Sequence, residues 1–241
     1  MADADDGLEV YDPEVSRVLA VVAHPDDLEY GAAAAVARWT AAGHHVTYLL
    51  ATRGEAGIDG ITPDRCAPLR EEEQRRSAAV VGVEVVEFLD RPDGVLVHDV
   101  DLRRDLAAAI RRHRPDTLIT LNHRADWGRP GSFNSADHRA LGSALIDAVA
   151  DAGNRWIFAG IGGEPHGARR LLVANSPMAR HAIDVTGHVD AAVGSLAEHR
   201  AYLEGLGDHP MADPEFVRWN LEDTGTRVGL GAALRVEVFE F

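Results

Sequence analysis

The chain has 241 residues, of which 46% are hydrophobic and 26% charged, and its formal net charge is −15. Apart from histidine, every basic residue is an arginine. So acidic a chain has no general attraction for nucleic acid or for an anionic membrane, and we expect neither as a partner. The single cysteine, Cys66, excludes an intramolecular disulfide and a metal site built from cysteines.

The first sixteen residues are acidic and lack the charged-then-apolar pattern of a secretion signal. We expect residues 1–16 to form a flexible lead-in and residues 17–241 to form one domain. No apolar run approaches the ~18 residues that span a membrane, so we expect a cytoplasmic protein without membrane insertion.

Short β-branched apolar runs alternate with helix-like stretches along the rest of the chain. Strands are predicted at residues 17–23, 45–52, 83–89, 116–121, 169–175 and 234–241. Helices are predicted at residues 28–43, 68–82, 99–114, 135–153 and 189–206. This alternation predicts βαβ units, and therefore an α/β domain with a mostly parallel sheet covered by helices on both faces.

Polar residues follow the ends of the first four predicted strands, at 24–27, 52–57, 90–94 and 122–127. In open sheets of this kind, ligands bind outside the carboxyl ends of the strands. We therefore expect these residues to gather at one edge of the sheet and to form the functional site.

The tetrapeptide "HPDD" joins the first predicted strand to the first helix. Proline and aspartates are ordinary at a helix start, but capping does not call for an imidazole there. His24 and Asp27 are three residues apart, so one turn can direct both at a common centre, whereas Asp26 is aimed differently. A bound metal explains the stretch, with Asp26 beside an open coordination position.

A third ligand should come from another strand end, and His138 in "FNSADHRALG" is the candidate. Ser135 or Asn134 can cap the helix that His138 begins. The alternative is that Asp137 and His138 are solvated residues of a first helical turn. Two histidines and one aspartate, with water, make an open and therefore catalytic ligand set.

The stretches "AHPDDLE", "TRGEAG", "LREEE", "FLDRPDG" and "ADHRALG" occur in the order and spacing of one family. From about residue 17 to residue 206, the chain resembles the LmbE-like deacetylases. These include the N-acetylglucosaminyl-phosphatidylinositol (PIG-L) deacetylases and the deacetylase and amidase of mycothiol metabolism. The resemblance implies a Rossmann-like sheet without a dinucleotide, and no GxGxxG follows the first predicted strand.

The resemblance also implies roles for individual residues. His24, Asp27 and His138 would bind one Zn²⁺ per chain, with Fe²⁺ as the alternative metal, and Asp26 would be the general base. The substrate contacts expected from the resemblance and from position along the chain are Arg70, Asp93, Tyr30 and Trp127. For Trp127, packing against the protein is the alternative to stacking on a sugar ring.

One position departs from the family pattern. Many relatives carry a histidine three residues before the last metal ligand, where it polarises the amide carbonyl, and here that position is Ser135. Either Ser135 or His123 would take over this role, with His123 preferred, or the metal would act alone. A plain loop histidine is the alternative reading of His123.

The predicted reaction is hydrolysis of an N-acetyl or other N-acyl group on an amino sugar or its conjugate, by metal-activated water with Asp26 as base. The alternatives are an amidase of a mycothiol-type thiol conjugate, a non-haem Fe(II) enzyme and a non-catalytic binding protein. Two histidines and a carboxylate are also the ligand set of non-haem Fe(II) oxygenases, so the Fe(II) alternative stays open. The expected partner is a small-molecule substrate. The sequence leaves open whether the chain forms a homo-oligomer.

Overall fold

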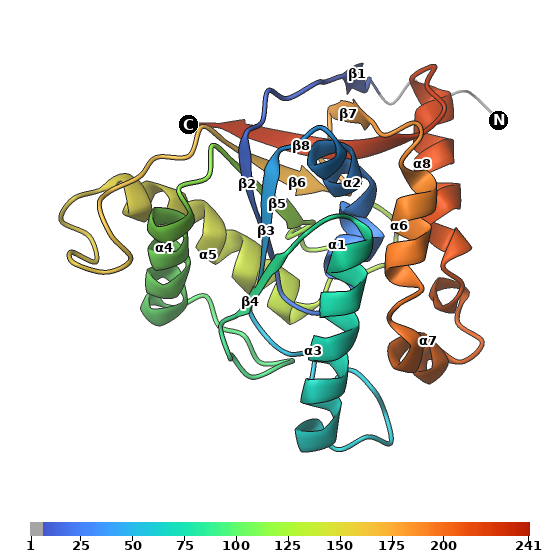
Figure 1. Cartoon of the computed structure of the whole chain (residues 1–241), viewed down its shortest axis with the longest axis horizontal. Helices are drawn as coiled ribbons and strands as arrows, with labels where there is room; N and C mark the ends of the chain where they lie inside the picture. Colours follow the sequence, from blue (N-terminus) through green and yellow to red (C-terminus); the bar gives the residue numbers. More distant parts are fainter. Residues whose placement is uncertain (1–6) are drawn as a thin grey trace.

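One eight-stranded sheet organises residues 7–241, the part of the chain that this computed structural model describes (Figure 1). Its strand order is β1-β7-β8-β6-β5-β2-β3-β4. Neighbouring strands are parallel except where β8 pairs with β6 and β7, so the predicted mostly parallel sheet is confirmed. The strands are β1 (Glu9–Val10), β2 (Arg17–Val22), β3 (His45–Leu50), β4 (Val85–Phe88), β5 (Thr117–Leu121), β6 (Arg170–Ala174), β7 (His181–Asp184) and β8 (Ala233–Glu240).

Helices cover both faces of the sheet. The helices are α1 (Asp27–Gly31), α2 (Ala33–Ala41), α3 (Pro63–Val80), α4 (Val100–His113), α5 (Ala136–Gly153), α6 (Val189–Leu196), α7 (Arg200–Leu206) and α8 (Glu215–Arg227). One apolar core lies between the sheet and α2, α6 and α8, and a second lies under α4 and α5 (Figure 1). Successive β2 residues alternate between the two cores, and this explains why its sequence is continuously apolar.

The parallel strands place the expected site. They stand in the order β4-β3-β2-β5-β6, so the chain moves outward in opposite directions from the β2–β5 pair. This is the arrangement of a doubly wound sheet, in which a crevice opens where the strand order reverses. The "HPDD" turn follows β2 and the segment leading to His138 follows β5, so both reach that crevice.

Several predicted boundaries differ from the structure. The helix predicted at 28–43 is interrupted at Ala32, next to a close approach in which a Cβ on Gly31 would lie 2.6 Å from the Leu121 side chain. The helix predicted at 189–206 divides into α6 and α7, because the residues between them turn a buried His199 inward. The helix predicted from residue 68 begins at Pro63, and β7 and α8 were not predicted at all.

The lead-in predicted at residues 1–16 contains one short strand in its described part, and its flexibility stays a prediction. Glu9–Val10 form β1, whose pairing with β7 gives this segment the hydrogen bonds of a sheet edge. Residues 1–6 lie outside the described part of the chain.

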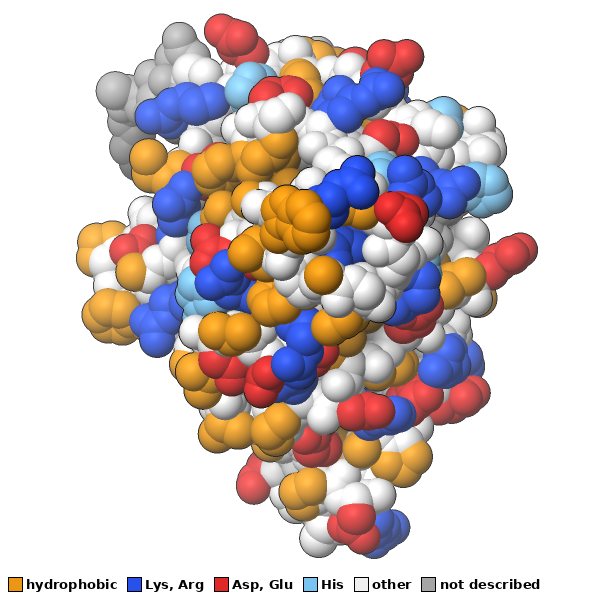
Figure 2. Space-filling model, turned by 90° about the vertical axis from the view of Figure 1, so that its left-hand side faces the viewer, with side chains coloured by type: hydrophobic (Ala, Val, Ile, Leu, Met, Phe, Trp, Pro, Cys, Tyr) orange, Lys and Arg blue, Asp and Glu red, His pale blue; other side chains and the backbone are white. Residues whose placement is uncertain are grey.

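The segment 154–169, between α5 and β6, extends beyond α4 and α5 (Figure 1). On that side of the molecule, apolar side chains lie among arginines and carboxylates at the surface (Figure 2). Trp156, 82% exposed, belongs to this segment. Within residues 7–241, every helix is too short or too polar to cross a bilayer.

Candidate metal centre

The turn after β2 is shaped by the Asp27 side chain. Asp27 begins α1, and its Oδ2 accepts hydrogen bonds from the backbone N–H groups of Ala23 (3.1 Å) and His24 (2.9 Å). The carboxylate thus ties the first helical turn to the strand end. Its other oxygen, Oδ1, lies 2.9 Å from Nε2 of His138 on α5.

Three potential ligand atoms converge at this point. His138 Nε2 lies 3.3 Å from His24 Nδ1 and 2.9 Å from Asp27 Oδ1, and His24 Nδ1 lies 3.5 Å from Asp27 Oδ2. The two imidazole rings are tilted by 53° with their centroids 5.1 Å apart. A tetrahedral metal with bonds of about 2.0–2.1 Å has ligands about 3.3 Å apart, so these spacings suit a zinc-like ion.

The outward nitrogens of both rings are held by acceptors. His24 Nε2 lies 3.1 Å from Asp93 Oδ1 and 3.2 Å from Asp137 Oδ2, and His138 Nδ1 lies 2.9 Å from Asn134 Oδ1. Because carboxylate and amide oxygens accept, each neutral ring carries its proton on the outward nitrogen. In this neutral form, two nitrogen lone pairs and a carboxylate would face one another across the centre, a set of groups that can bind a cation.

Charge at the centre follows from the same contacts. Burial would raise the pKa of Asp27, but His138 and His24 outweigh it and hold that pKa below its usual range. Burial lowers the pKa of His24, but the Asp27 charge and the hydrogen bonds to Asp137 and Asp93 raise it well above its usual range. Asp27 is therefore ionised, and the site favours positive charge.

Asp137 is a residue of the candidate site that sequence reasoning missed. It is 2% exposed, not solvated, and it accepts from the N–H groups of Gly94 (2.8 Å) and Leu96 (3.0 Å) as well as from His24. It thus joins the loop after β4 to α5 and fixes the His24 ring. His24, Asp93 and Asp137 also meet closely enough to suggest a second metal group, but there a histidine N–H already donates to the carboxylates.

Asp26 occupies a strained position beside the ligands. Its φ of 86° lies in the left-handed region, which costs free energy for any residue with a Cβ. Its N–H donates to Gln74 Oε1 (3.0 Å), and its carboxylate contacts the Arg70 guanidinium. Burial raises the pKa of Asp26 to about 6, while the Arg70 charge lowers it and that of Asp27 adds to the rise.

The buried face of α3 supports Asp26. Gln74 Nε2 donates to Glu29 Oε1 (2.8 Å), which also accepts from Ser77 Oγ (2.6 Å). Of the α3 residues, the sequence led us to expect only Arg70 at the site. The missed signal was the spacing of Arg70, Gln74 and Ser77, which places them on one helical face.

Arg70 lies differently from the expected sugar contact. It is 2% exposed, its guanidinium lies 4.3 Å from the centre of the Tyr202 ring, and it also contacts the Pro25 carbonyl. Its donors thus serve Asp26 and the "HPDD" backbone. A direct role in substrate binding stays a prediction, as does that of Asp93, which accepts from the Ala56 N–H as well as contacting His24.

The two candidates for carbonyl polarisation have structural partners. Ser135 caps α5, its Oγ accepting from the His138 N–H at 3.1 Å. His123 is buried against Gly142, one turn beyond His138, where a glycine Cβ would lie 2.2 Å from the His123 Cβ. Burial lowers the pKa of His123, which favours the neutral ring, and its Nδ1 has no hydrogen-bond partner among the described residues.

The two aromatic residues expected to contact substrate, Trp127 and Tyr30, lie in different surroundings. Trp127 meets the His138 ring edge-on, with centroids 6.1 Å apart, so it lies at the metal centre while also packing on the core. Tyr30 turns toward the C-terminal part of the chain, where its hydroxyl donates to the Met211 carbonyl and its ring meets Phe216.

Comparison with known proteins bears on this geometry. Residues 19–149 match the family model described as PIG-L: GlcNAc-PI de-N-acetylase. The chain belongs to this family. The resemblance inferred from the sequence motifs is thereby confirmed.

Two proteins that this chain resembles are named as deacetylases. The diacetylchitobiose deacetylase of Thermococcus kodakarensis is 29% identical over 196 residues, covering 78% of this chain and 70% of the relative. The 1D-myo-inositol 2-acetamido-2-deoxy-alpha-D-glucopyranoside deacetylase of Kineococcus radiotolerans is 28% identical over 244 residues, covering 76% and 68%.

Solved structures confirm the fold. The conserved protein TT1542 of Thermus thermophilus is 27% identical with a TM-score of 0.77, covering 92% of this chain and 93% of the other. GalB, the 4-carboxy-2-hydroxymuconate hydratase of Pseudomonas putida, is 20% identical with a TM-score of 0.73, covering 92% and 95%. A hydratase thus shares this fold, so the reaction must be argued from the site.

Proposed function

We propose that this PIG-L family protein is a metal-dependent hydrolase that removes the N-acetyl group of an amino sugar or amino-sugar conjugate. The observation that carries the proposal is the convergence of His24 Nδ1, Asp27 Oδ1 and His138 Nε2, three atoms that can bind one metal ion together. Two imidazoles and one carboxylate are a ligand set of catalytic zinc, so Zn²⁺ is the proposed metal. Its relatives' action on acetylated amino sugars supports the substrate class.

When bound, the metal would supply Lewis acidity toward the amide carbonyl and make water a stronger acid. The protein supplies the proton transfers. Arg70 contacts Asp26 Oδ2, and the proposed role of Asp26 is to accept a proton during attack and to return it to the departing amine. Because the guanidinium stabilises the carboxylate, the proposed role of Arg70 is to keep Asp26 charged and oriented.

Substrate contacts follow from position. Trp127 stands at the His138 ring and offers an apolar surface of the kind on which a sugar ring stacks. His123 stays the proposed donor to the carbonyl oxygen, because the Ser135 hydroxyl oxygen already caps α5. Asp93 orients His24 from the other side of the ring.

Metal analysis and a deacetylation assay test the proposal together. The purified protein should contain about one divalent metal per chain, and the zinc-loaded form should release free amine from at least one N-acetylated amino sugar. His138→Ala should lose both properties, whereas the matched control His45→Ala, an exposed histidine at the start of β3, should keep them. Full metal occupancy in His138→Ala would overturn the ligand set, and bound iron without amine release would favour the Fe(II) alternative.

A further inference from the structure

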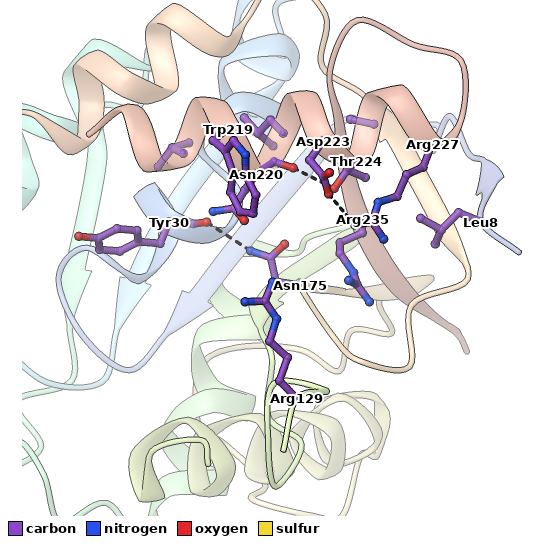
Figure 3. A pocket seen from close by; sticks show the side chains of 13 residues that line it. Leu8, Tyr30, Arg129, Asn175, Trp219, Asn220, Asp223, Thr224, Arg227 and Arg235 are labelled. Atoms are coloured by element: carbon purple, nitrogen blue, oxygen red, sulfur yellow. Dashed lines mark hydrogen bonds and ion pairs between the residues drawn. The ribbon is translucent and has the colours of Figure 1, made fainter. Parts of the chain in front are cut away.

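A pocket lies between α8, β8 and the loop that follows β5 (Figure 3). We call it the α8 pocket, and its cavity volume is about 70 Å³. That volume is well below the range of about 300–1,000 Å³ typical of sites for whole small molecules, so the pocket suits a single small group. Its principal lining residues are Tyr30, Arg129, Asn175, Trp219, Arg227 and Arg235.

Two connections join the α8 pocket to the metal centre. Tyr30 lies on α1 three residues after Asp27, and its backbone carbonyl accepts from Asn175 Nδ2 (3.3 Å) at the pocket wall (Figure 3). Arg129 lies two residues after Trp127, which touches His138. The α8 pocket is therefore built on the same helix and the same loop as the candidate metal centre.

The charge of the pocket is opposite to that of the protein. Arginines reach it from three separate segments, the loop after β5, α8 and β8, although the chain carries a net charge of −15 (Figure 3). Asp223 is the carboxylate in the lining, and it pairs with Arg227 at 2.7 Å. Arg129 has no ion pair with any residue of the described part of the chain. The lining therefore keeps an excess of positive charge.

The chemistry of the lining indicates what would fill it. Guanidinium groups bind carboxylate and phosphate oxygens through paired, charge-assisted hydrogen bonds. The side-chain amides of Asn175 and Asn220 add neutral donors and acceptors. Trp219, 57% exposed beside them, offers an aromatic face to an adjoining ring.

We propose that the α8 pocket binds an anionic group, phosphate or carboxylate, carried by the substrate beyond its N-acetylated sugar ring. The inference rests on the proposed function and narrows its substrate to acidic amino-sugar conjugates. Trp219, Arg227 and Arg235 lie outside the family-matched residues 19–149, whereas Arg129 lies within them.

Three N-acetylglucosamine derivatives test the pocket: the methyl glycoside, the 1-phosphate and the carboxymethyl glycoside. We expect kcat/KM to be about tenfold or more higher for at least one anionic derivative than for the neutral one. Arg129→Glu should reduce that preference about tenfold, because it reverses the charge on an exposed loop residue. Arg155→Glu, the matched control on the distant 154–169 segment, should retain the preference.

A binding measurement separates failure of this inference from failure of the proposed function. Inorganic phosphate should raise the melting temperature of the wild-type protein above its value in chloride of equal ionic strength, and Arg129→Glu should lose this rise. If no derivative is hydrolysed but phosphate stabilises in this way, the pocket stands and the deacetylase proposal fails. Equal kcat/KM for charged and neutral derivatives, or equal effects of Arg129→Glu and Arg155→Glu, would overturn the inference.

Discussion

Two buried polar regions of this protein satisfy their hydrogen bonds in opposite ways. Arg111 on α4, 3% exposed, donates to the backbone carbonyls of residues at and beyond the end of α5. There every donor meets an acceptor, and nothing further is needed. At the candidate metal centre, side-chain nitrogen and oxygen atoms of His24, Asp27 and His138 meet one another instead. The first region satisfies its own donors, whereas the second gathers groups that can bind a cation.

The largest effect is expected from removing the charged acceptor at the metal centre. Asp27→Ala deletes both the anionic ligand and the acceptor for the Ala23 and His24 N–H groups. Metal content should fall from about one per chain to nearly none, and turnover should be lost with it. Elemental analysis and an amine-release assay on the same sample measure both, and retention of metal and turnover would contradict the ligand assignment.

Asp26→Asn should separate catalysis from metal binding. The amide preserves the shape of the side chain but cannot take up a proton, so kcat should fall by ~10²–10⁴ while metal content stays at one per chain. KM should change little. Loss of metal in this variant would show that Asp26 is a ligand and not a base.

Arg111→Met should lower the stability of the fold, whereas the previous variants change metal binding or turnover. The buried carbonyls lose their donor, so the free energy of unfolding should fall by about 3 kcal/mol or more in urea denaturation. The folded fraction should still bind one metal per chain. The neighbouring Arg112→Met, which breaks only a surface pair with Glu87, should cost about 0–1 kcal/mol, and equal losses would refute this contrast.

The smallest effect is expected from removing the hydrogen bond that Gln74 accepts from the Asp26 backbone. Gln74→Met removes the acceptor for the strained Asp26 N–H, so kcat should fall about tenfold with KM and metal content unchanged. Ser77→Ala removes another partner of the same Glu29 carboxylate but leaves Asp26 alone, so its kcat should stay within about twofold of wild type. A comparable drop in both variants would mean that general packing, not the Asp26 contact, is responsible.

The sequence predicted what depends on local spacing. His24 and Asp27 share one turn, and alternating strands and helices bring His138 to the same edge, so the converging ligands could be foreseen. Asp137 could not, because its burial depends on the N–H groups of Gly94 and Leu96 from a distant loop. The helix α8 mixes Trp219, Asn220 and Thr224 with charged residues, so its periodicity was weak and the pocket beside it stayed hidden.

The position of β8 has a consequence for synthesis on the ribosome. This strand is the last along the chain, yet it lies inside the sheet, between β6 and β7. Until β8 has been made, one edge of β6 has no partner strand. β7 and β1 cannot join the sheet either, because they are connected to it through β8. Such a late, long-range pairing is costly in loop-closure entropy. A nascent chain thus carries the residues proposed to bind the metal before it carries β8, and the wall of the α8 pocket that Arg235 provides is assembled only once β8 has been made.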